Sequence, residues 1–444
     1  MLAYPKQILI EPLDGPFEVL IRPPGSKSLT NRALLLAALA EGASTLTNVL
    51  FADDTRVMMR ALQQLGFNLE IDEANMAVTV HGQAGRIPSN SAELHLGNSG
   101  TSVRFLTAAC CLGDPASQYV IDGIPRMRRR PIDGLIDPLR QMGATIEYLA
   151  EPGYPPIRIH GGGLDGSALS LGPMLSSQFV SAMLMVAPFC RHLLDLRFDG
   201  PINSLPYIIM TLDLMEWFGA PIAQRTMGPR FQLTPGKYQA LALAVEPDAS
   251  NASYFLASAA LIPKATCRVK GLGTDSLQGD TAFAASILRS MGALVRVGTE
   301  EIEVTGSQLN GIDRSLNDIP DMALTLGTLA VLAHGPTTIR DVGNLRVKET
   351  DRISALKIEL EKLGADVSVD EDDLHIGPPP DGRIPPGVSI NTYDDHRIAM
   401  SFSILGLIPG GAGLTINEPS CVAKTYPRFF DDLQLLRAST QAST

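Results

Sequence analysis

A group of polar side chains stands immediately before an apolar segment near the start of the chain. Lys27, Ser28 and Arg32 lie in this group, and residues 33–40 are only alanine and leucine. Because the first N–H groups of a helix have no partner within it and the helix dipole is positive there, this end should bind an anion. It is not a P-loop, because no glycine stands five residues before a Gly-Lys pair. Alone, the segment fits an ordinary capped helix with a solvent lysine equally well.

The same arrangement occurs six times, which favours the anion-binding interpretation. The predicted helices cover residues 31–40, 99–112, 176–189, 248–262, 321–333 and 394–407, and each begins with Ser, Thr, Asn or Asp. Their bodies are apolar around the whole circumference, which predicts buried helices. If their polar starts face one cleft, that cleft is strongly positive and attracts small polyanions.

A second repeat consists of a helix, a glycine and a β-branched run. The glycines are Gly66, Gly143, Gly219, Gly292 and Gly364, spaced 77, 76, 73 and 72 residues apart. Glycine in this position is typical of the residue after a helix C-terminus, and the run that follows reads as a strand. The period predicts six α/β units of about 74 residues, three in each of two domains.

The domain boundaries are expected where proline-containing segments interrupt the repeat. We predict a first domain over residues 26–246 and a second domain over 1–25 together with 247–437, with stiff hinges at Pro23–Gly25 and Glu246–Asp248. Residues 438–444 are predicted to form a flexible tail.

Composition limits the possible partners. The 444 residues include 47 Asp and Glu against 36 Lys and Arg, with a pI near 5.2, which argues against nucleic acid or an anionic membrane as the main partner. Five cysteines without CxxC spacing indicate neither a zinc site nor a disulfide framework. No apolar run approaches the roughly 18 residues of a membrane span, so we expect a cytoplasmic protein.

Two local clusters carry most of the basic charge. Residues 122–131 hold four arginines, and residues 344–352 alternate cations with carboxylates. The first could be a nucleic-acid patch or a solvated loop, but no aromatic residues are interleaved to stack bases. The second could equally be an exposed, salt-bridged helix start.

Taken together, these segments resemble the motifs of the 5-enolpyruvylshikimate-3-phosphate synthase family, the 3-phosphoshikimate 1-carboxyvinyltransferases. The similar segments, in order over residues 23–430, are Pro24–Ser28 with Asn31 and Arg32, Gly97–Thr101, Asp122–Met127, Ser176–Gln178, Asp248–Ser253, Ile319–Asp321, Arg346–Arg352, Asp395–Arg397 and Ala423–Thr425.

The resemblance implies a fold and an activity. The fold would be an α/β (α+β) two-domain inside-out barrel of six βαβαββ repeats, three per domain. The activity would be transfer of the enolpyruvyl group of phosphoenolpyruvate to the 5-hydroxyl of shikimate 3-phosphate, with release of phosphate, by addition and elimination through a tetrahedral intermediate. That reaction belongs to the shikimate pathway, which leads to chorismate and the aromatic amino acids. The resemblance further implies a cytoplasmic monomer that is a glyphosate target and needs no metal or organic cofactor.

The resemblance also implies the site residues. Shikimate 3-phosphate would contact Lys27, Ser28, Arg32, Ser176, Ser177, Gln178, Ser204, Tyr207, Asp321, Asn344 and Lys348. Phosphoenolpyruvate would contact Lys27, Asn98, Gly100, Arg126, Gln178, Arg352, Arg397 and Lys424. The catalytic residues would be Asp321, Glu349 and Lys27, with Asp321 as the base and Glu349 as the acid; the two carboxylates could exchange roles in the second half-reaction.

Two departures and two alternatives accompany this interpretation. Phe105 stands where many family members have proline, from which we predict reduced sensitivity to glyphosate, and Leu205 stands where some have lysine.

One alternative is the related transferase that acts on a UDP-sugar, which would be expected to carry a cysteine in a mobile loop. Cys110 and Cys111 instead lie in a predicted buried helix. The other alternative is a non-catalytic phosphometabolite-binding protein, against which the presence of both Asp321 and Glu349 argues.

Overall fold

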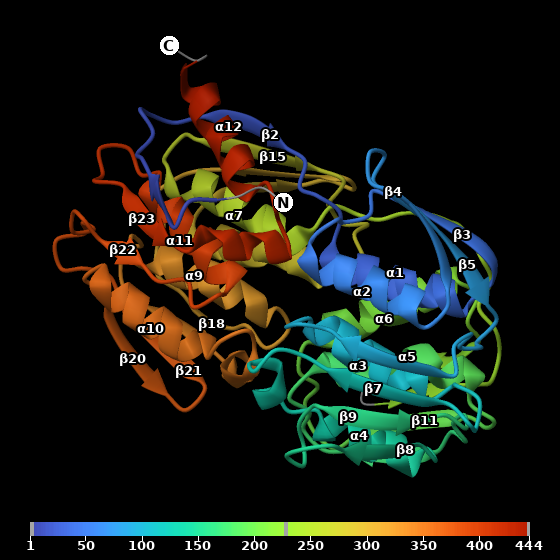
Figure 1. Ribbon diagram of the computed structural model, residues 1–444. Coiled ribbons are helices and arrows are strands. Elements are labelled where there is room, and N and C mark those ends of the chain that lie inside the picture. Colours follow the sequence, from blue (N-terminus) through green and yellow to red (C-terminus); the bar gives the residue numbers. More distant parts are fainter. Residues whose placement is uncertain (1–3, 226–229, 442–444) are drawn as a thin grey trace. The chain divides into compact units, whose positions relative to one another are not determined.

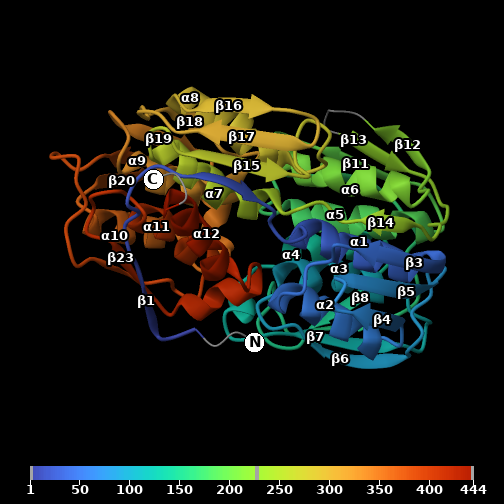
Figure 2. The ribbon, with the colours of Figure 1, turned by 90° about the horizontal axis from the view of Figure 1, so that it is seen from above.

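The computed structural model describes residues 4–225 and 230–441, in two compact units (Figures 1 and 2). Unit 1 comprises Met1–Pro24 and Glu246–Thr444, and unit 2 comprises Gly25–Val245. Both units are built from helices and small sheets, so the mixed α/β class predicted from the sequence is confirmed.

The sheets of unit 2 share one strand order. In each, two parallel strands are followed by two antiparallel ones. The orders are β6 (Ser91–His95), β7 (Gln118–Asp122), β9 (Ile157–His160), β8 (Thr145–Tyr148); β10 (Ala168–Leu171), β11 (Leu194–Phe198), β13 (Arg230–Leu233), β12 (Ile222–Arg225); and β14 (Ala242–Ala244), β3 (Glu41–Thr47), β5 (Ala77–Gln83), β4 (Asn68–Asp72).

The sheets of unit 1 repeat this pattern, with the last one lacking a strand among the described residues. The orders are β2 (Glu18–Ile21), β15 (Thr266–Lys270), β17 (Glu301–Thr305), β16 (Leu294–Val297); β18 (Asp313–Ser315), β19 (Thr337–Arg340), β21 (Asp373–Gly377), β20 (Asp366–Asp370); and β22 (Ser389–Ile390), β23 (Leu414–Asn417), β1 (Gln7–Ile10). Each sheet in the described ranges has two free edges and does not close into a barrel.

The helices predicted to be buried form the cores of the units. They are α1 (Lys27–Leu39), α3 (Gly100–Cys110) and α5 (Ser177–Val186) in unit 2, and α7 (Ala249–Leu261), α9 (Ala323–Ala330) and α11 (His396–Gly406) in unit 1. In unit 1 all three pack against one another, and in unit 2 α3 contacts both α1 and α5. Each fully buried Leu, Ile, Val, Phe or Met side chain in these helices stabilises its unit by about 1.5–3 kcal/mol, and each buried alanine by less.

The helices that precede the repeated glycines pack one face against these cores. They are α2 (Asp53–Gln64), α4 (Asp133–Gln141), α6 (Leu205–Trp217), α8 (Arg289–Met291) and α10 (Arg352–Lys362). The glycine after each has a φ between 82° and 110°, a left-handed conformation that a residue with a Cβ rarely adopts. The prediction that these glycines end helices is therefore confirmed.

Short helical turns supply the remaining elements. They are η1 (Met127–Arg129), η2 (Ala187–Phe189), η3 (Gly279–Thr281), the π-helical η4 (Phe283–Leu288), η5 (Pro320–Met322), η6 (Gly343–Val347) and η7 (Pro419–Lys424). The last helix, α12 (Phe429–Gln441), continues through residues 438–441, where the sequence predicts a flexible tail; residues 442–444 lie outside the described ranges. No helix in the described part of the chain is long and apolar enough to cross a membrane.

Candidate active site

In unit 2, the first buried helix holds an arginine in its interior. Ser26 caps α1 by accepting a hydrogen bond from the Leu29 N–H, and Arg32 one turn later is only 1% exposed. Arg32 Nε donates to Thr211 Oγ1 at 2.7 Å, and its Nη2 donates to Ser181 Oγ at 3.2 Å. These partners come from α6 and α5, so the guanidinium joins three helices.

The surroundings of Arg32 contain neutral partners. Its Nη1 donates to the carbonyl oxygen of Ser28 at 3.0 Å, and the Phe105 ring centroid lies 5.0 Å from the guanidinium carbon. Burial lowers the pKa of Arg32 to about 10, and the proximity of Tyr207 offsets part of that lowering. Because a buried cation is costly without a negative partner, this position favours an anionic ligand.

A second group of cations surrounds the start of α3. Arg130 Nη1 donates to the backbone and side-chain oxygens of Asn98, both at 3.2 Å. A Cβ atom on Gly100 would lie 2.7 Å from Arg104 Nη1 and 2.7 Å from Arg130 Nη2, closer than side-chain atoms normally approach. Glycine therefore lets two guanidiniums reach the backbone where the first N–H groups of α3 are free of intrahelical bonds.

The other candidates in unit 2 also lie at helix starts. Lys27 is the first residue of α1, and its Nζ is 3.6 Å from Asp54 Oδ2. Ser176 caps α5 and accepts a hydrogen bond from the Gln178 N–H at 3.2 Å. Ser177 begins α5, Ser204 precedes α6 with a left-handed φ of 56°, Tyr207 lies in the first turn of α6, and Arg126 precedes η1.

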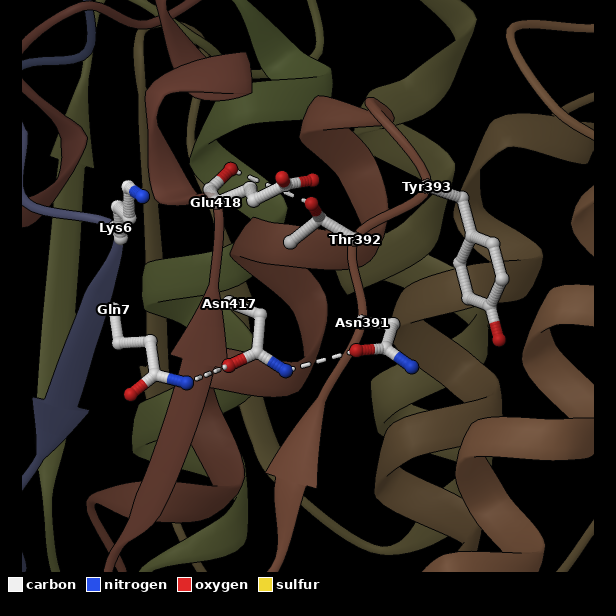
Figure 3. Close-up of a pocket in the computed structure, with 7 residues that line it drawn as sticks. All are labelled: Lys6, Gln7, Asn391, Thr392, Tyr393, Asn417 and Glu418. Atoms are coloured by element: carbon white, nitrogen blue, oxygen red, sulfur yellow. Dashed lines mark hydrogen bonds between the residues drawn. The ribbon is translucent and has the colours of Figure 1, made fainter.

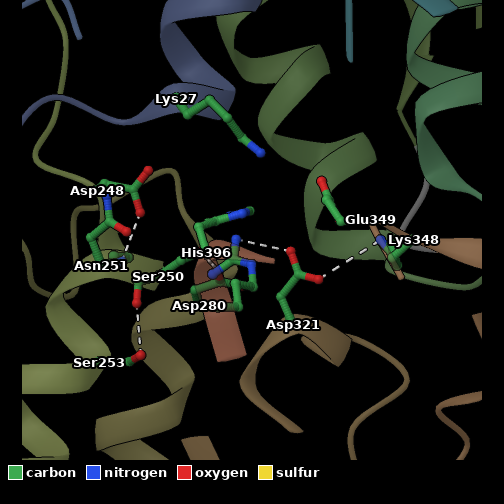
Figure 4. A network of polar contacts seen from close by, with 12 residues as sticks. Lys27, Asp248, Ser250, Asn251, Ser253, Asp280, Asp321, Lys348, Glu349 and His396 are labelled. Carbon is green, nitrogen blue, oxygen red and sulfur yellow. Dashed lines mark hydrogen bonds and ion pairs between the residues drawn. The ribbon is translucent and has the colours of Figure 1, made fainter. Parts of the chain in front are cut away.

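In unit 1, Arg352 is the centre of a network of ion pairs (Figure 4 shows part of it). Its Nη1 is 2.7 Å from Asp321 Oδ1, and its Nη2 is 2.8 Å from Glu349 Oε2. Its Nε lies 2.7 Å from Asp395 Oδ2. Burial alone would lower the pKa of Arg352, but the three carboxylates outweigh burial and raise it above its usual value. Both proposed catalytic carboxylates thus share one guanidinium.

Asp321 is surrounded by further cations. Lys348 Nζ lies 3.8 Å from Asp321 Oδ1 (Figure 4). Arg397 Nη2 lies 3.0 Å from Asp321 Oδ2. Burial would raise the pKa of Asp321, but Arg397, Lys348 and Arg352 together hold it well below its usual range. Asp321 is therefore ionised at neutral pH.

Glu349 has a different cationic neighbour. Lys424, at the end of η7, places its Nζ 3.3 Å from Glu349 Oε1.

Asn344 lies in η6 and is buried, and its Oδ1 has no hydrogen-bond partner among the described residues. A buried acceptor in that state favours a ligand that donates a hydrogen bond. The structure therefore brings Asp321, Lys348, Glu349, Arg352, Arg397 and Lys424 together.

Two residues of this network are absent from the sequence prediction of the site. Asp395 binds Arg352 and caps α11 by accepting from the Arg397 N–H at 2.9 Å. The Tyr254 hydroxyl accepts a hydrogen bond from Arg397 Nη1 at 3.3 Å. Asp395 could have been found from its place in the polar start of the helix predicted over residues 394–407; Tyr254, inside an apolar helix, carries no such signal.

The buried cysteines agree with the sequence interpretation. Cys110 and Cys111 lie at the end of α3 with almost no exposure, and burial raises the pKa of Cys111 to about 12. A thiol with so high a pKa is a poor nucleophile or acid at neutral pH. These cysteines therefore do not match the loop cysteine expected of the UDP-sugar transferase.

An open hollow of about 660 Å³ also lies in unit 1 (Figure 3). Its floor is a row of amides in which Gln7 Nε2 donates to Asn417 Oδ1 and Asn417 Nδ2 donates to Asn391 Oδ1. Lys6 and Glu418 stand at one side and Tyr393 at the other. The hollow lacks the clustered cations that a substrate with two anionic groups needs.

Comparison with known proteins agrees with this geometry. Residues 14–433 match the family model of EPSP synthase (3-phosphoshikimate 1-carboxyvinyltransferase). The chain is 47% identical to the 3-phosphoshikimate 1-carboxyvinyltransferase of Sulfurovum sp., over 93% of this chain and 95% of that protein. It is 46% identical to that of Serratia proteamaculans, over 92% and 94%. Its fold is similar to that of the EPSP synthase from Acinetobacter baumannii, with a TM-score of 0.78 and 30% identity over 97% of this chain and 98% of that one.

The match extends across both units, and it includes the helix starts of unit 2 as well as the carboxylates and arginines of unit 1. This sequence match and this shared architecture show that the chain belongs to the EPSP synthase family, the 3-phosphoshikimate 1-carboxyvinyltransferases.

Proposed function

We propose a division of work between the two units in the transfer of the enolpyruvyl group from phosphoenolpyruvate to shikimate 3-phosphate. Unit 2 would supply most of the groups that bind shikimate 3-phosphate, and unit 1 would supply the acid and the base. The buried Arg32 supports the first assignment, because its partners are hydroxyls, a carbonyl and an aromatic ring. A phosphate or hydroxyl-rich ligand would complete this set of hydrogen bonds.

The proposed contacts of shikimate 3-phosphate follow the family resemblance. They are Lys27, Ser28, Arg32, Ser176, Ser177, Gln178, Ser204, Tyr207, Asp321, Asn344 and Lys348. Those proposed for phosphoenolpyruvate are Lys27, Asn98, Gly100, Arg126, Gln178, Arg352, Arg397 and Lys424. Arginine suits the second set because its planar fork matches a carboxylate or a phosphate with paired hydrogen bonds.

The proposed reaction has two steps. In the first, the 5-hydroxyl oxygen of shikimate 3-phosphate bonds to C2 of phosphoenolpyruvate, the hydroxyl loses its proton, and C3 gains one to become a methyl group. In the second, that methyl group loses a proton, the C2–C3 double bond reforms, and the bond from C2 to the phosphate oxygen breaks. Inorganic phosphate leaves, and the enolpyruvyl ether remains.

Asp321 and Glu349 are suited to these proton transfers. We assign Asp321 as the base because its carboxylate is ionised, and Glu349 as the acid because it contacts Arg352 and Lys424 on the proposed phosphoenolpyruvate side. In the second step the two can exchange roles as proton donor and acceptor. Lys27 would neutralise charge on the departing phosphate.

Three finer features complete the proposal. The enzyme would act as a cytoplasmic monomer on small-molecule substrates and would be a glyphosate target, with the reduced sensitivity predicted from Phe105. Its two units would correspond to a first domain of residues 26–246 and a second of 1–25 with 247–437. The repeated strand order supports three βαβαββ units in each, arranged as the family's inside-out barrel.

The observation that carries the catalytic proposal is the shared contact of Arg352, at 2.7 Å from Asp321 and 2.8 Å from Glu349. The test is release of inorganic phosphate from phosphoenolpyruvate in the presence of shikimate 3-phosphate. Asp321→Asn and Glu349→Gln should each lower turnover by roughly 10²-fold or more while shikimate 3-phosphate still binds. Asp318→Asn and Glu361→Gln are matched controls, because both residues are exposed. Turnover like that of the wild type in both catalytic variants would overturn the assignment.

A further inference from the structure

The segment between β22 and α11 has a strained backbone. Tyr393 and Asp394 have φ angles of 55° and 57°, both in the left-handed region. Aspartate tolerates that region better than most residues, but a bulky side chain such as that of Tyr393 seldom occupies it. Such a conformation persists only where neighbouring groups hold it, and Asp395 follows immediately.

A buried carboxylate holds the first part of this segment. Glu359, on α10, is 0% exposed. It accepts hydrogen bonds from the Tyr393 hydroxyl at 2.6 Å and from the Asn391 N–H at 3.2 Å. The Lys362 ammonium group, 2.6 Å from Glu359 Oε2, balances its charge.

The Tyr393 hydroxyl is a lasting donor to this carboxylate. The pKa of Tyr393 is raised to about 12, mainly by burial and next by the hydrogen bond to Glu359. The hydroxyl therefore keeps its proton over the whole physiological pH range, and the contact with Glu359 does not switch.

The second part of the segment is held by the same helix. Asp395 receives hydrogen bonds from Arg352 Nε at 2.7 Å and from Arg352 Nη2 at 3.2 Å. Arg352 and Glu359 are seven residues apart on α10, close to two helical turns, so both side chains project from one face of the helix. Residues 391–395 are thus attached to α10 at two points.

From these contacts we infer that Glu359 is a positioning residue for the active site. By holding Asn391 and Tyr393 against α10, it fixes the place of Asp395, which orients Arg352 and caps the helix that carries Arg397. Glu359 itself touches none of the residues proposed to bind a substrate. The inference rests on the proposed function, since it concerns the two arginines assigned to phosphoenolpyruvate.

The expected consequence is larger for one substrate than for the other. Arg352 and Arg397, both assigned to phosphoenolpyruvate, would shift with Asp395. Most groups assigned to shikimate 3-phosphate lie in unit 2 and do not depend on this segment; Asp321 in unit 1 pairs with both arginines, so a small effect on shikimate 3-phosphate is expected. Because a misplacement of about 1 Å in a binding group can cost up to about 10²-fold, release of the segment should weaken phosphoenolpyruvate binding measurably.

Two variants test the inference. Glu359→Gln keeps the side-chain shape but turns an amide N–H group toward a donor, and Tyr393→Phe removes one hydroxyl only. The KM for each substrate and kcat would be measured by phosphate release, and folding would be checked by the melting temperature. Glu361→Gln is the matched control, because Glu361 lies on the same helix and pairs only with the partly exposed Lys357 among the described contacts.

The inference predicts a KM for phosphoenolpyruvate that rises about tenfold in Glu359→Gln and about threefold in Tyr393→Phe. The KM for shikimate 3-phosphate should stay within about twofold of the wild type, and Glu361→Gln should match the wild type. Equal changes in both KM values, or unchanged KM values with only a lower melting temperature, would show a structural role and overturn the inference. If Glu359→Gln does not fold, Tyr393→Phe alone decides. Failure of the proposed function would appear separately, as a wild-type protein that releases no phosphate.

Discussion

Arg32 in unit 2 and Arg352 in unit 1 are equally buried, at 1% exposure, but they differ in their partners. Arg352 contacts Asp321, Glu349 and Asp395, which raise its pKa. Among the described residues no carboxylate pairs with Arg32, and burial lowers its pKa to about 10. The cation of unit 1 is compensated within the protein, whereas in the described part of the chain that of unit 2 has no negative partner.

This contrast separates two tasks. A cation without a counter-charge is costly in the free protein and favourable in the complex, which suits a residue whose task is to bind an anion. A cation shared among several carboxylates favours their ionised form and fixes them in place, which suits a carboxylate that accepts a proton. The two regions should therefore respond differently to the same substitution.

The largest expected effect is on stability in unit 1. Arg352→Met would leave three buried or nearly buried carboxylates without their central partner, and we expect a loss of about 3–5 kcal/mol in the free energy of unfolding. Urea denaturation followed by circular dichroism would measure it. Arg340→Met is the control, because Arg340 is exposed and pairs with Asp313 on the surface; its effect should stay below about 1 kcal/mol. Equal losses in the two variants would contradict the central role of Arg352.

The next effect is on ligand binding in unit 2. Arg32→Met should change the free energy of unfolding by less than about 1 kcal/mol or raise it, because an apolar side chain replaces an uncompensated charge. Loss of one charge-assisted hydrogen bond, worth about 1.5–3 kcal/mol, should weaken binding of shikimate 3-phosphate by roughly 10- to 100-fold. Calorimetric titration would measure this. Arg191→Met is the control, because Arg191 is exposed. This variant should bind shikimate 3-phosphate as tightly as the wild type does. Strong destabilisation by Arg32→Met would mean that the protein already compensates this charge.

A smaller effect is expected on the stability of the folded protein at acidic pH. The pKa of Asp321 is lower in the folded protein than its usual value of about 3.9, so the unfolded chain takes up a proton first as the pH falls. The stability that Asp321 contributes is thus complete above about pH 5 and is lost as the pH falls from there toward the folded pKa. Between pH 4 and pH 3 the wild type should lose about 1 kcal/mol more than Asp321→Asn. Parallel curves of stability against pH would contradict the lowered pKa.

The repeated elements of both units could be predicted because their signals are local. A segment such as residues 33–40 has no polar side chain to expose, and Gly143 can take a φ that other residues avoid. The pairing of Arg352 with Asp395 could not be predicted, since these residues are 43 positions apart and meet only through packing of α10 against the segment before α11. The burial of Glu359 could not be predicted from the sequence for another reason. A charged residue on an amphipathic helix looks like part of the solvent face, and only Tyr393, Asn391 and Lys362 make its burial possible.

The smallest expected effect concerns Phe105, whose ring lies 5.0 Å from the Arg32 guanidinium. An aromatic ring attracts a cation by about 0.5–2 kcal/mol but carries no net charge, so it can hold the guanidinium in place without competing for the anionic ligand. Phe105→Leu keeps an apolar side chain and removes this attraction, and the KM for shikimate 3-phosphate should rise about two- to tenfold. The KM for phosphoenolpyruvate should not change, because Gly100 lies more than one helical turn away on α3. Measurement of the glyphosate inhibition constant in the same variant tests the sequence prediction about this residue. If the ratio of that constant to the KM for phosphoenolpyruvate changes while the KM for shikimate 3-phosphate does not, Phe105 acts through Gly100 and not through Arg32.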